Sequence, residues 1–251
     1  MLHLARRALA QHIAPPQLPA HLDLDEPPVR VALRVSARAR RFTLRLEQRG
    51  PGAVLTMPIG VSLATVQGFL HEHRRWLTRA LESRPADIAV GQGTALPIDG
   101  TPLTVNLDPN AGRTPRIQGA CLILAPGGPV GPRLQGWLKT RARARLVPAL
   151  QGYAAQLGRP VAAVALRDTR SRWGSCSSTG RVGLSWRLAM APPAVQAYVA
   201  AHEAAHLVEM NHSPRYWAVL EGLMPDYAVH RAWLRTHGRQ LQAYDFGITS
   251  R

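Results

Sequence analysis

Apolar and polar positions alternate in three short segments near the start of the chain. The alternation is strict over 29–35 and returns over 42–46 and 53–57. A period of two is typical of strands with one buried face, so each segment is predicted to be a strand. The valine, leucine and phenylalanine positions would face a core, and the arginines would face outward. We therefore expect a twisted antiparallel sheet with one basic side.

Helical spacing and turn signals follow in the middle of the chain. Ser62 is expected to cap a helix that runs to about residue 81, and Asp-Gly at 99–100 predicts a hairpin turn. A long helix is expected after the loop at 127–132, and Pro148 should kink or break it. The boundaries expected here are 96–103 for the hairpin, 115–124 for a further strand and 134–157 for the long helix.

The last third of the chain combines a predicted hairpin with three predicted helices. A strand at 164–167 precedes a hairpin that ends near residue 188, and Gly174 within it indicates a close backbone approach. Pro192-Pro193 suits the first turn of a helix. A second helix is expected from Ser213-Pro214, and a third between Asp226, as its cap, and Gly238, as its end.

The first of these helices carries the motif His202-Glu203-Ala204-Ala205-His206. Residues four apart lie on the same face of a helix, so two imidazoles at this spacing can bind one Zn²⁺. Glu203 lies one residue round from His202 and can face a metal-bound water without being a ligand. A buried helix with two histidines and a glutamate is the structural alternative, and the helical context together with a further histidine favours zinc.

A catalytic zinc site has three protein ligands and one open position, so a third ligand is needed. Asn211 could end the helix in a left-handed cap, and the turn would bring His212 back to the metal. Glu209 is the rival because it shares the helix face, although it lies about 10.5 Å along the axis from His202. The spacing favours His212, and one zinc per chain is expected.

The charge of the chain is strongly basic, with a net of +16 over 251 residues. Lys139 is the only lysine, and residues 30 to 49 hold seven arginines and one acid. Such an excess indicates a polyanionic partner, because neutralising phosphates drives sequence-independent nucleic-acid binding. Arg30, Arg34 and Arg45 share the outward parity of the predicted strands and are the candidate contacts. An arginine-rich but merely basic surface is the alternative.

Other features limit the class of protein. No run of about 18 apolar residues exists, so no membrane span is expected, and the first residues lack the apolar core of a secretion signal. The two cysteines, Cys121 and Cys176, fit a reducing cytoplasm, and Cys176 is expected to be a small packing residue. A cytoplasmic location is predicted, and the sequence does not indicate an oligomeric state.

Several motifs in order resemble those of the YgjP-like metallopeptidase family, a bacterial group related to the SprT and WLM zinc peptidases. The motifs are Arg172-Trp173-Gly174-Ser175-Cys176, the His202 to His206 segment, Asn211-His212-Ser213-Pro214 and Pro225-Asp226-Tyr227. The resemblance runs from about residue 29 to 238. It departs at Ala204-Ala205, where the family usually has a larger apolar residue after the glutamate.

The resemblance implies an α+β protein. An N-terminal antiparallel sheet domain with a helix would precede a zincin-like metallopeptidase domain built on a hairpin and the His-Glu-x-x-His helix. It also implies zinc held by His202, His206 and His212, with Glu203 as the catalytic base. The predicted division is a flexible extension at 1–28, a basic β-rich domain at 29–130, the metallopeptidase domain at 131–240 and a tail at 241–251.

Three functions remain open from the sequence. The first is a zinc-dependent peptidase acting on peptides or proteins, with Glu203 taking a proton from the metal-bound water. Arg170, Arg172, Tyr216 or His230 could then contact the substrate or stabilise the oxyanion. The second is a metal-dependent nucleotide phosphoanhydride hydrolase whose arginines hold phosphates. The third is a non-catalytic nucleic-acid-binding zinc protein.

Overall fold

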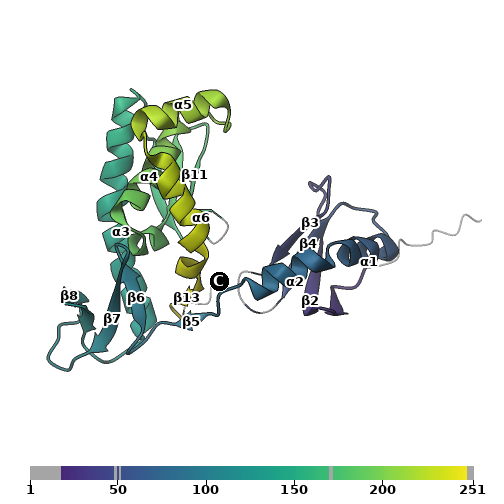
Figure 1. Ribbon diagram of the computed structural model, residues 1–251, viewed down its shortest axis with the longest axis horizontal. Helices are drawn as coiled ribbons and strands as arrows, with labels where there is room; N and C mark the ends of the chain where they lie inside the picture. Colours follow the sequence, from purple (N-terminus) through teal and green to yellow (C-terminus); the bar gives the residue numbers. More distant parts are fainter. Residues whose placement is uncertain (1–17, 48–49, 51, 170–171, 248–251) are drawn as a thin grey trace, which may run out of the picture. The chain divides into compact units, whose positions relative to one another are not determined.

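The computed structural model describes residues 18–47, 50, 52–169 and 172–247 of the chain. Its α+β structure divides into two compact units, one ending at Arg84 and the other beginning at Pro85 (Figure 1). The sequence predicted a boundary near residue 130. The division differs because the strands between 85 and 130 bury their apolar faces in the core of the second unit.

The first unit is a four-stranded sheet whose strand order is β1-β2-β4-β3. The antiparallel prediction was wrong for one pair, since β2 and β4 run parallel while β1–β2 and β3–β4 are antiparallel. The parallel pair arises because β3 follows β2 in sequence but lies beyond β4, at the sheet edge. The strands are β1 (His21–Asp25), β2 (Pro28–Val35), β3 (Thr43–Leu46) and β4 (Ala53–Met57).

Two helices cover the apolar face of this sheet. The single helix expected from Ser62 is divided at His73 into α1 (Leu63–Glu72) and α2 (Arg74–Glu82). Ser62 caps α1 as predicted, accepting a hydrogen bond from the Thr65 amide. Val66, Leu70 and Leu77 are buried from the helix side, packing with the sheet residues Val31, Leu55 and Met57. Apolar and polar residues alternate regularly in these strands because only one face of the sheet packs on this core.

The opposite face of the sheet carries the predicted arginines together with acids that the sequence analysis had placed in a flexible extension. Strand β1 lies within that extension, and its register puts Asp23 opposite Arg30. The Arg30 guanidinium donates to the Asp23 carboxylate at 2.8 Å, so this charge is paired. Arg34 and Arg45 are exposed on the same face, and no ion pair joins either one to another described residue.

In the second unit, a sheet and a long helix enclose the core. The sheet has the order β6-β7-β9-β8, with the predicted Asp-Gly turn between β6 and β7 and an unpredicted turn that divides 115–124 into β8 and β9. Helix α3 (Val130–Gln156) passes Pro148 unbroken. The strands are β5 (Ile88–Ala89), β6 (Ala95–Ile98), β7 (Thr101–Leu107), β8 (Arg116–Gln118) and β9 (Cys121–Leu124).

A three-stranded sheet, a short 3₁₀ helix, three α-helices and the strand β13 complete this unit. The sheet order is β10-β12-β11, so β11 is an edge strand, and β11–β12 form the predicted hairpin. The remaining elements are β10 (Ala163–Arg167), β11 (Gly174–Cys176), β12 (Arg181–Ser185), the 3₁₀ helix η1 (Trp186–Met190), α4 (Pro193–Ala205), α5 (Pro214–Leu223), α6 (Tyr227–Ala243) and β13 (Tyr244–Asp245).

Asp99, in the β6–β7 turn, holds the start of α4 in place. Its carboxylate accepts hydrogen bonds from Arg141 and Arg145 on α3 and from the Gln196 side chain on α4, the last at 2.8 Å. Asp99 itself has a φ of 52°, a left-handed conformation that aspartate tolerates better than most residues. The turn therefore joins two helices through one carboxylate.

The described part of the segment expected to be a C-terminal tail, residues 241–247, contributes to the core. Phe246 is 1% exposed and packs edge-on against Trp186, and β13 pairs with β5. The buried Arg187 donates to the Asp168 carboxylate at 2.7 Å and to the carbonyl oxygens of Leu241 and Tyr244. A buried guanidinium needs such partners, so this network holds the end of α6 against η1.

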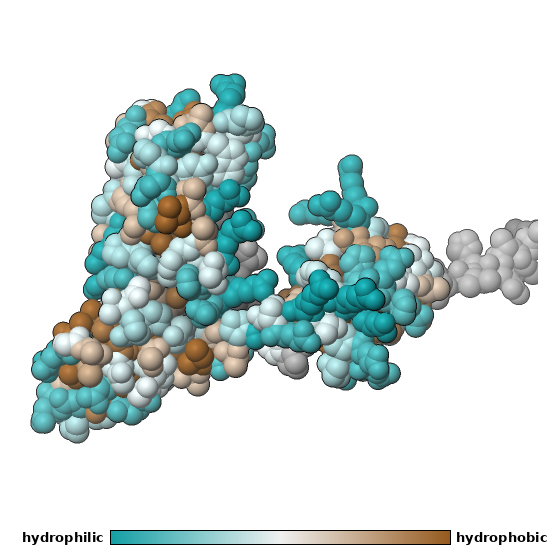
Figure 2. Space-filling model, in the orientation of Figure 1, coloured by the Kyte–Doolittle hydropathy of each residue, from teal (hydrophilic) through white to brown (hydrophobic). Residues whose placement is uncertain are grey.

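Hydrophilic residues cover much of the viewed face of each unit, and apolar residues lie in small separate patches (Figure 2). Among the described residues, no helix combines the length and apolar character needed to cross a membrane.

Candidate metal centre

Helix α4 carries His202 and Glu203, and it ends earlier than the sequence suggested. The expected cap was Asn211, but the helix stops at Ala205 with His206 as its C-cap in a right-handed conformation. The Glu209 amide still donates to the Ala205 carbonyl at 3.0 Å, so the chain turns tightly after the helix. This early turn brings His212 back beside the helix.

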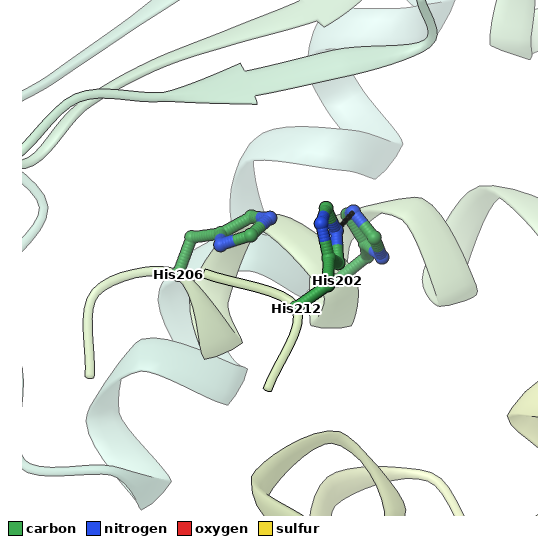
Figure 3. Close-up of side chains that lie close together, drawn as sticks. All are labelled: His202, His206 and His212. Atoms are coloured by element: carbon green, nitrogen blue, oxygen red, sulfur yellow. Dashed lines mark hydrogen bonds between the residues drawn. The ribbon is translucent and has the colours of Figure 1, made fainter. Parts of the chain in front are cut away.

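Three imidazoles converge at this turn. The ligand atoms of His202, His206 and His212 all lie within 4.8 Å of one another, as one metal ion would require. Figure 3 shows the rings turned toward a common point, with His202 Nε2 and His212 Nε2 3.3 Å apart. Two nitrogen ligands of a tetrahedral zinc, each at about 2.0–2.1 Å, would be separated by about 3.3–3.4 Å. The donor set therefore fits a metal ion.

Hydrogen bonds fix the tautomers of two of these histidines. The Tyr216 hydroxyl donates its single proton to the His202 carbonyl at 3.1 Å, so it accepts from His202 Nδ1 at 2.6 Å. The Glu209 carbonyl can only accept, so His206 Nδ1 donates to it at 3.1 Å. In both rings Nδ1 carries the proton and Nε2 keeps its lone pair, which is the arrangement that metal-binding histidines have.

Burial favours the neutral form of His202 and His206, the form that binds a metal ion. The pKa of His202 is lowered to about 3, mainly by burial and to a smaller extent by the neighbouring His206, His212 and Arg231. The pKa of His206 is also lowered, again mainly by burial.

Glu203 lies beside the three histidines and has no hydrogen-bond partner for one of its oxygens. The residue is 3% exposed, and Oε2 is unpartnered among the described residues. Burial raises the pKa of this carboxyl to about 8, although Arg172 acts in the opposite direction. A buried carboxylate without partners costs free energy, so its position indicates a role other than stability.

Gly174 provides the space for this carboxylate. A Cβ at residue 174 would lie 2.1 Å from Glu203 Oε1, far inside contact distance. The close approach predicted from the sequence is therefore confirmed, and its partner is the glutamate side chain. Strand β11 and helix α4 can pack this closely only because residue 174 has no side chain.

The histidines and Glu203 line a pocket of about 610 Å³ between β11, α4 and α6. Arg172 lines it as expected, and Cys176 does so as a partly buried thiol whose pKa burial raises to about 11. Tyr216 does not line it. It is fully buried behind His202, so the structure gives it an orienting contact in place of the substrate contact expected for it.

Two other candidate residues, Glu209 and His230, make contacts away from the histidine cluster. The Glu209 carboxylate is 3.9 Å from Arg215 and does not belong to the histidine cluster. His230 pairs with Asp226 at 3.0 Å and is absent from the described lining of the pocket. Arg170 lies outside the described residues.

Helix α6 supplies pocket residues that the sequence analysis missed. It continues to Ala243, so Gly238 lies within the helix and packs against the Trp173 ring, 3.1 Å from the position a Cβ would take. Arg231 and Arg235, one turn apart on the same helix, line the pocket. The spacing of 231, 234, 235 and 238 was a usable signal, because these positions share one helix face.

Comparison with protein families identifies a match over most of the chain. The family model described as YgjP-like, metallopeptidase domain matches residues 40–237, which includes the whole histidine cluster. A comparison with curated proteins gives no match.

The contact between Gly174 and Glu203 can be tested by folding stability. We expect Gly174→Ala to lower the free energy of unfolding by about 1–3 kcal/mol, the usual cost of overpacking. In a Glu203→Ala background the same substitution should cost much less, because the clashing carboxylate is gone. Chemical denaturation of the four proteins measures both values.

Gly152→Ala is the matched control, since a Cβ there would meet nothing within 4 Å. It lies in helix α3, where alanine is favoured over glycine, so stability should stay level or rise. If Gly174→Ala cost the same with and without Glu203, the carboxylate would not be the group that requires glycine.

Proposed function

The chain belongs to the YgjP-like metallopeptidase family, and from this premise we propose that it is a zinc-dependent peptidase with a zincin-like site. His202, His206 and His212 would hold one Zn²⁺ per chain, and Glu203 would act as the general base. The substrate would be a peptide or protein, and the protein would act in the cytoplasm.

One observation carries this proposal. A buried, unpartnered carboxylate and three converging imidazoles share one pocket, and two of the imidazoles have their tautomers set for ligation through Nε2. A structural zinc site is normally closed by four protein ligands. The donor group described here has three histidines, and Glu203 beside them suits proton transfer. The site therefore supports catalysis over a purely structural role.

Bound zinc would supply Lewis acidity and lower the pKa of a coordinated water towards about 7. The Glu203 carboxylate would take a proton as water oxygen bonds to the scissile carbonyl carbon. When the carbon–nitrogen bond breaks, Glu203 would pass that proton to the leaving amine. Arg172 lines the same pocket and is the described candidate for stabilising the oxyanion.

Strand β11 suits an extended substrate. Ser185 donates its amide proton to the Trp173 carbonyl and Ser177 donates to the Arg181 carbonyl, so alternate residues of this segment face β12. The alternation of an antiparallel ladder then turns the backbone groups of Gly174 and Cys176 to the open edge. A peptide could add to this edge as a strand, with its backbone bonded beside Glu203.

Metal content tests the ligand set. Purified wild-type protein should hold one zinc per chain by elemental analysis, and His202→Ala, His206→Ala and His212→Ala should each lose most of it. Tyr216→Phe removes the group that holds His202 Nδ1, so metal affinity should fall by about 10–100-fold. Full zinc retention in His212→Ala would assign the third position to another residue.

Hydrolysis tests the role of Glu203. Glu203→Gln should keep zinc and lose activity by about 10²–10⁴-fold, because an amide cannot accept the proton. Activity is measured on an unfolded protein, on nucleoside triphosphates and on DNA–protein adducts, each with and without chelator. Chelator-sensitive cleavage of the nucleotides alone would establish the phosphoanhydride alternative, and no hydrolysis in any arm would favour a non-catalytic zinc protein.

Weak nucleic-acid binding by the first unit is a second candidate function, supported by the exposed Arg34 and Arg45 on one sheet face. Replacing both with glutamine should weaken binding to duplex DNA and flatten its salt dependence by about 0.9 per lost contact. Arg30→Gln is the matched control, since Asp23 already pairs that charge. Anisotropy at several salt concentrations measures the slope. Equal effects from all three arginines would contradict this assignment.

A further inference from the structure

The pocket beside the histidines is lined by more positive charge than the proposed chemistry needs. Arg172, Arg231 and Arg235 all line it, and Glu203 is the one carboxylate among its described lining residues. Two of these arginines come from the pocket face of α6 and one from the approach to β11. A bound metal ion would add to the same sign of potential.

These three arginines differ from Arg141, Arg145 and Arg187, each of which has an ion pair with an aspartate. Arg141 and Arg145 pair with Asp99, and the buried Arg187 pairs with Asp168. No ion pair connects Arg172, Arg231 or Arg235 to any residue that the structure describes. Their guanidinium groups are therefore available to an anion that enters the pocket.

Arg231 is also held in position. Its guanidinium carbon lies 4.7 Å from the centre of the Trp217 ring, a cation–π contact. Trp217 in turn stacks on His212 and on Tyr227, each with ring centroids 5.6 Å apart. The cation is thereby fixed beside the histidine cluster. Arg235 follows one turn later on the same helix, so both lie along one wall of the pocket.

The rest of the wall is apolar and suits a peptide. Trp173, Tyr198, Val199 and Leu234 line the pocket beside the open edge of β11. A ligand that fits must combine an extended backbone, some apolar surface and an anionic group. A nucleotide would use the arginines but not the backbone groups at the edge of β11.

We propose that this pocket selects peptides that carry a carboxylate close to the scissile bond, with Arg231 and Arg235 as the residues that bind it. The carboxylate could belong to an aspartate or glutamate side chain or to the peptide C-terminus, since a guanidinium binds either one through paired N–H groups. This inference rests on the proposed peptidase function and names its substrate class.

Binding to a variant that cannot turn over substrate tests the selection directly. The probes are fluorescent alanine heptapeptides with one glutamate moved along the sequence, each matched by a glutamine version, and each made with a free and an amidated C-terminus. Anisotropy with zinc-loaded Glu203→Gln protein at fixed ionic strength gives the affinities. At the best position, glutamate should bind about 10–100-fold tighter than glutamine, as for hydrogen bonds between charged groups.

The preference should depend on α6. Adding Arg231→Gln or Arg235→Gln should reduce it, and both together should abolish it, while Arg231→Lys should keep part of it because the charge remains without the paired donors. Arg143→Gln, exposed on α3 and outside the pocket lining, is the matched control and should leave it unchanged. Circular dichroism confirms that each variant is folded.

The two peptide ends separate the sources of the carboxylate. A preference that persists in amidated peptides assigns it to a side chain, and one that needs the free terminus assigns it to the C-terminal carboxylate. Equal binding of glutamate and glutamine peptides at every position, or a preference that survives the double arginine substitution, overturns the inference. The inference is also overturned if a nucleoside triphosphate binds more tightly than any peptide and Arg231→Gln abolishes that nucleotide binding.

Failure of this inference is distinguishable from failure of the peptidase proposal. If the wild-type protein cleaves unfolded protein with no preference for sites near acidic residues, the peptidase proposal is supported and the proposed selection of acidic peptides is contradicted. Charge-dependent peptide binding without any cleavage would contradict the peptidase proposal and support a pocket that binds acidic ligands.

Discussion

The site depends on a carboxylate held away from water with nothing in the described structure to satisfy it. Glu203 is nearly inaccessible, and the strand that covers it can approach only at a glycine. Such a group is unfavourable in a protein interior, so the surrounding packing must offset its cost. The offset comes from α4, whose alanine-rich face is fully buried in the main core. The helix cannot move to relieve the carboxylate without disturbing that core.

The geometry around the histidines depends on where α4 ends. If the helix had continued to Asn211, His206 Nδ1 would have had no Glu209 carbonyl in reach from the turn, and His212 would have pointed away. Because the helix ends at Ala205, the Glu209 carbonyl can accept a hydrogen bond from the His206 ring, and the chain turns back so that His212 lies beside the helix. Tyr216, from the following helix, orients the first ring from behind. Two of the three rings are thus oriented by contacts within the chain, His206 by a backbone carbonyl and His202 by a buried hydroxyl.

Local signals were sufficient for much of this arrangement. The spacing of His202 and His206, the Ser213-Pro214 start of α5 and the Asp-Gly turn each depend on a few neighbouring residues, and the structure contains the helices and turn they indicated. The grouping of His212 with the other two rings also agrees with the expectation.

The packing of segments that are far apart in the sequence could not be predicted from these local signals. The parallel pairing of β2 with β4, the place of 85–130 in the second core and the burial of Phe246 all depend on contacts between distant segments. The place of Arg231 and Arg235 in the pocket wall was missed for the same reason, since α6 lies well beyond the motif in sequence. Tyr216 was expected to contact substrate, and its contact with His202 was not predicted.

The alanines on α4 have a consequence for how this sequence can change over time. Ala200, Ala201, Ala204 and Ala205 are all completely buried in a core that they share with Leu138, Ala142 and Leu146 of α3. Interiors are close-packed, so an added methylene on one helix needs a matching loss of volume opposite it. The facing residues of the two helices are therefore expected to covary among descendants of this chain, and a relative with a larger residue after the position of Glu203 should have smaller residues facing it. The volume of this interface, more than the chemistry of the three histidines, would then limit which substitutions this lineage can accept.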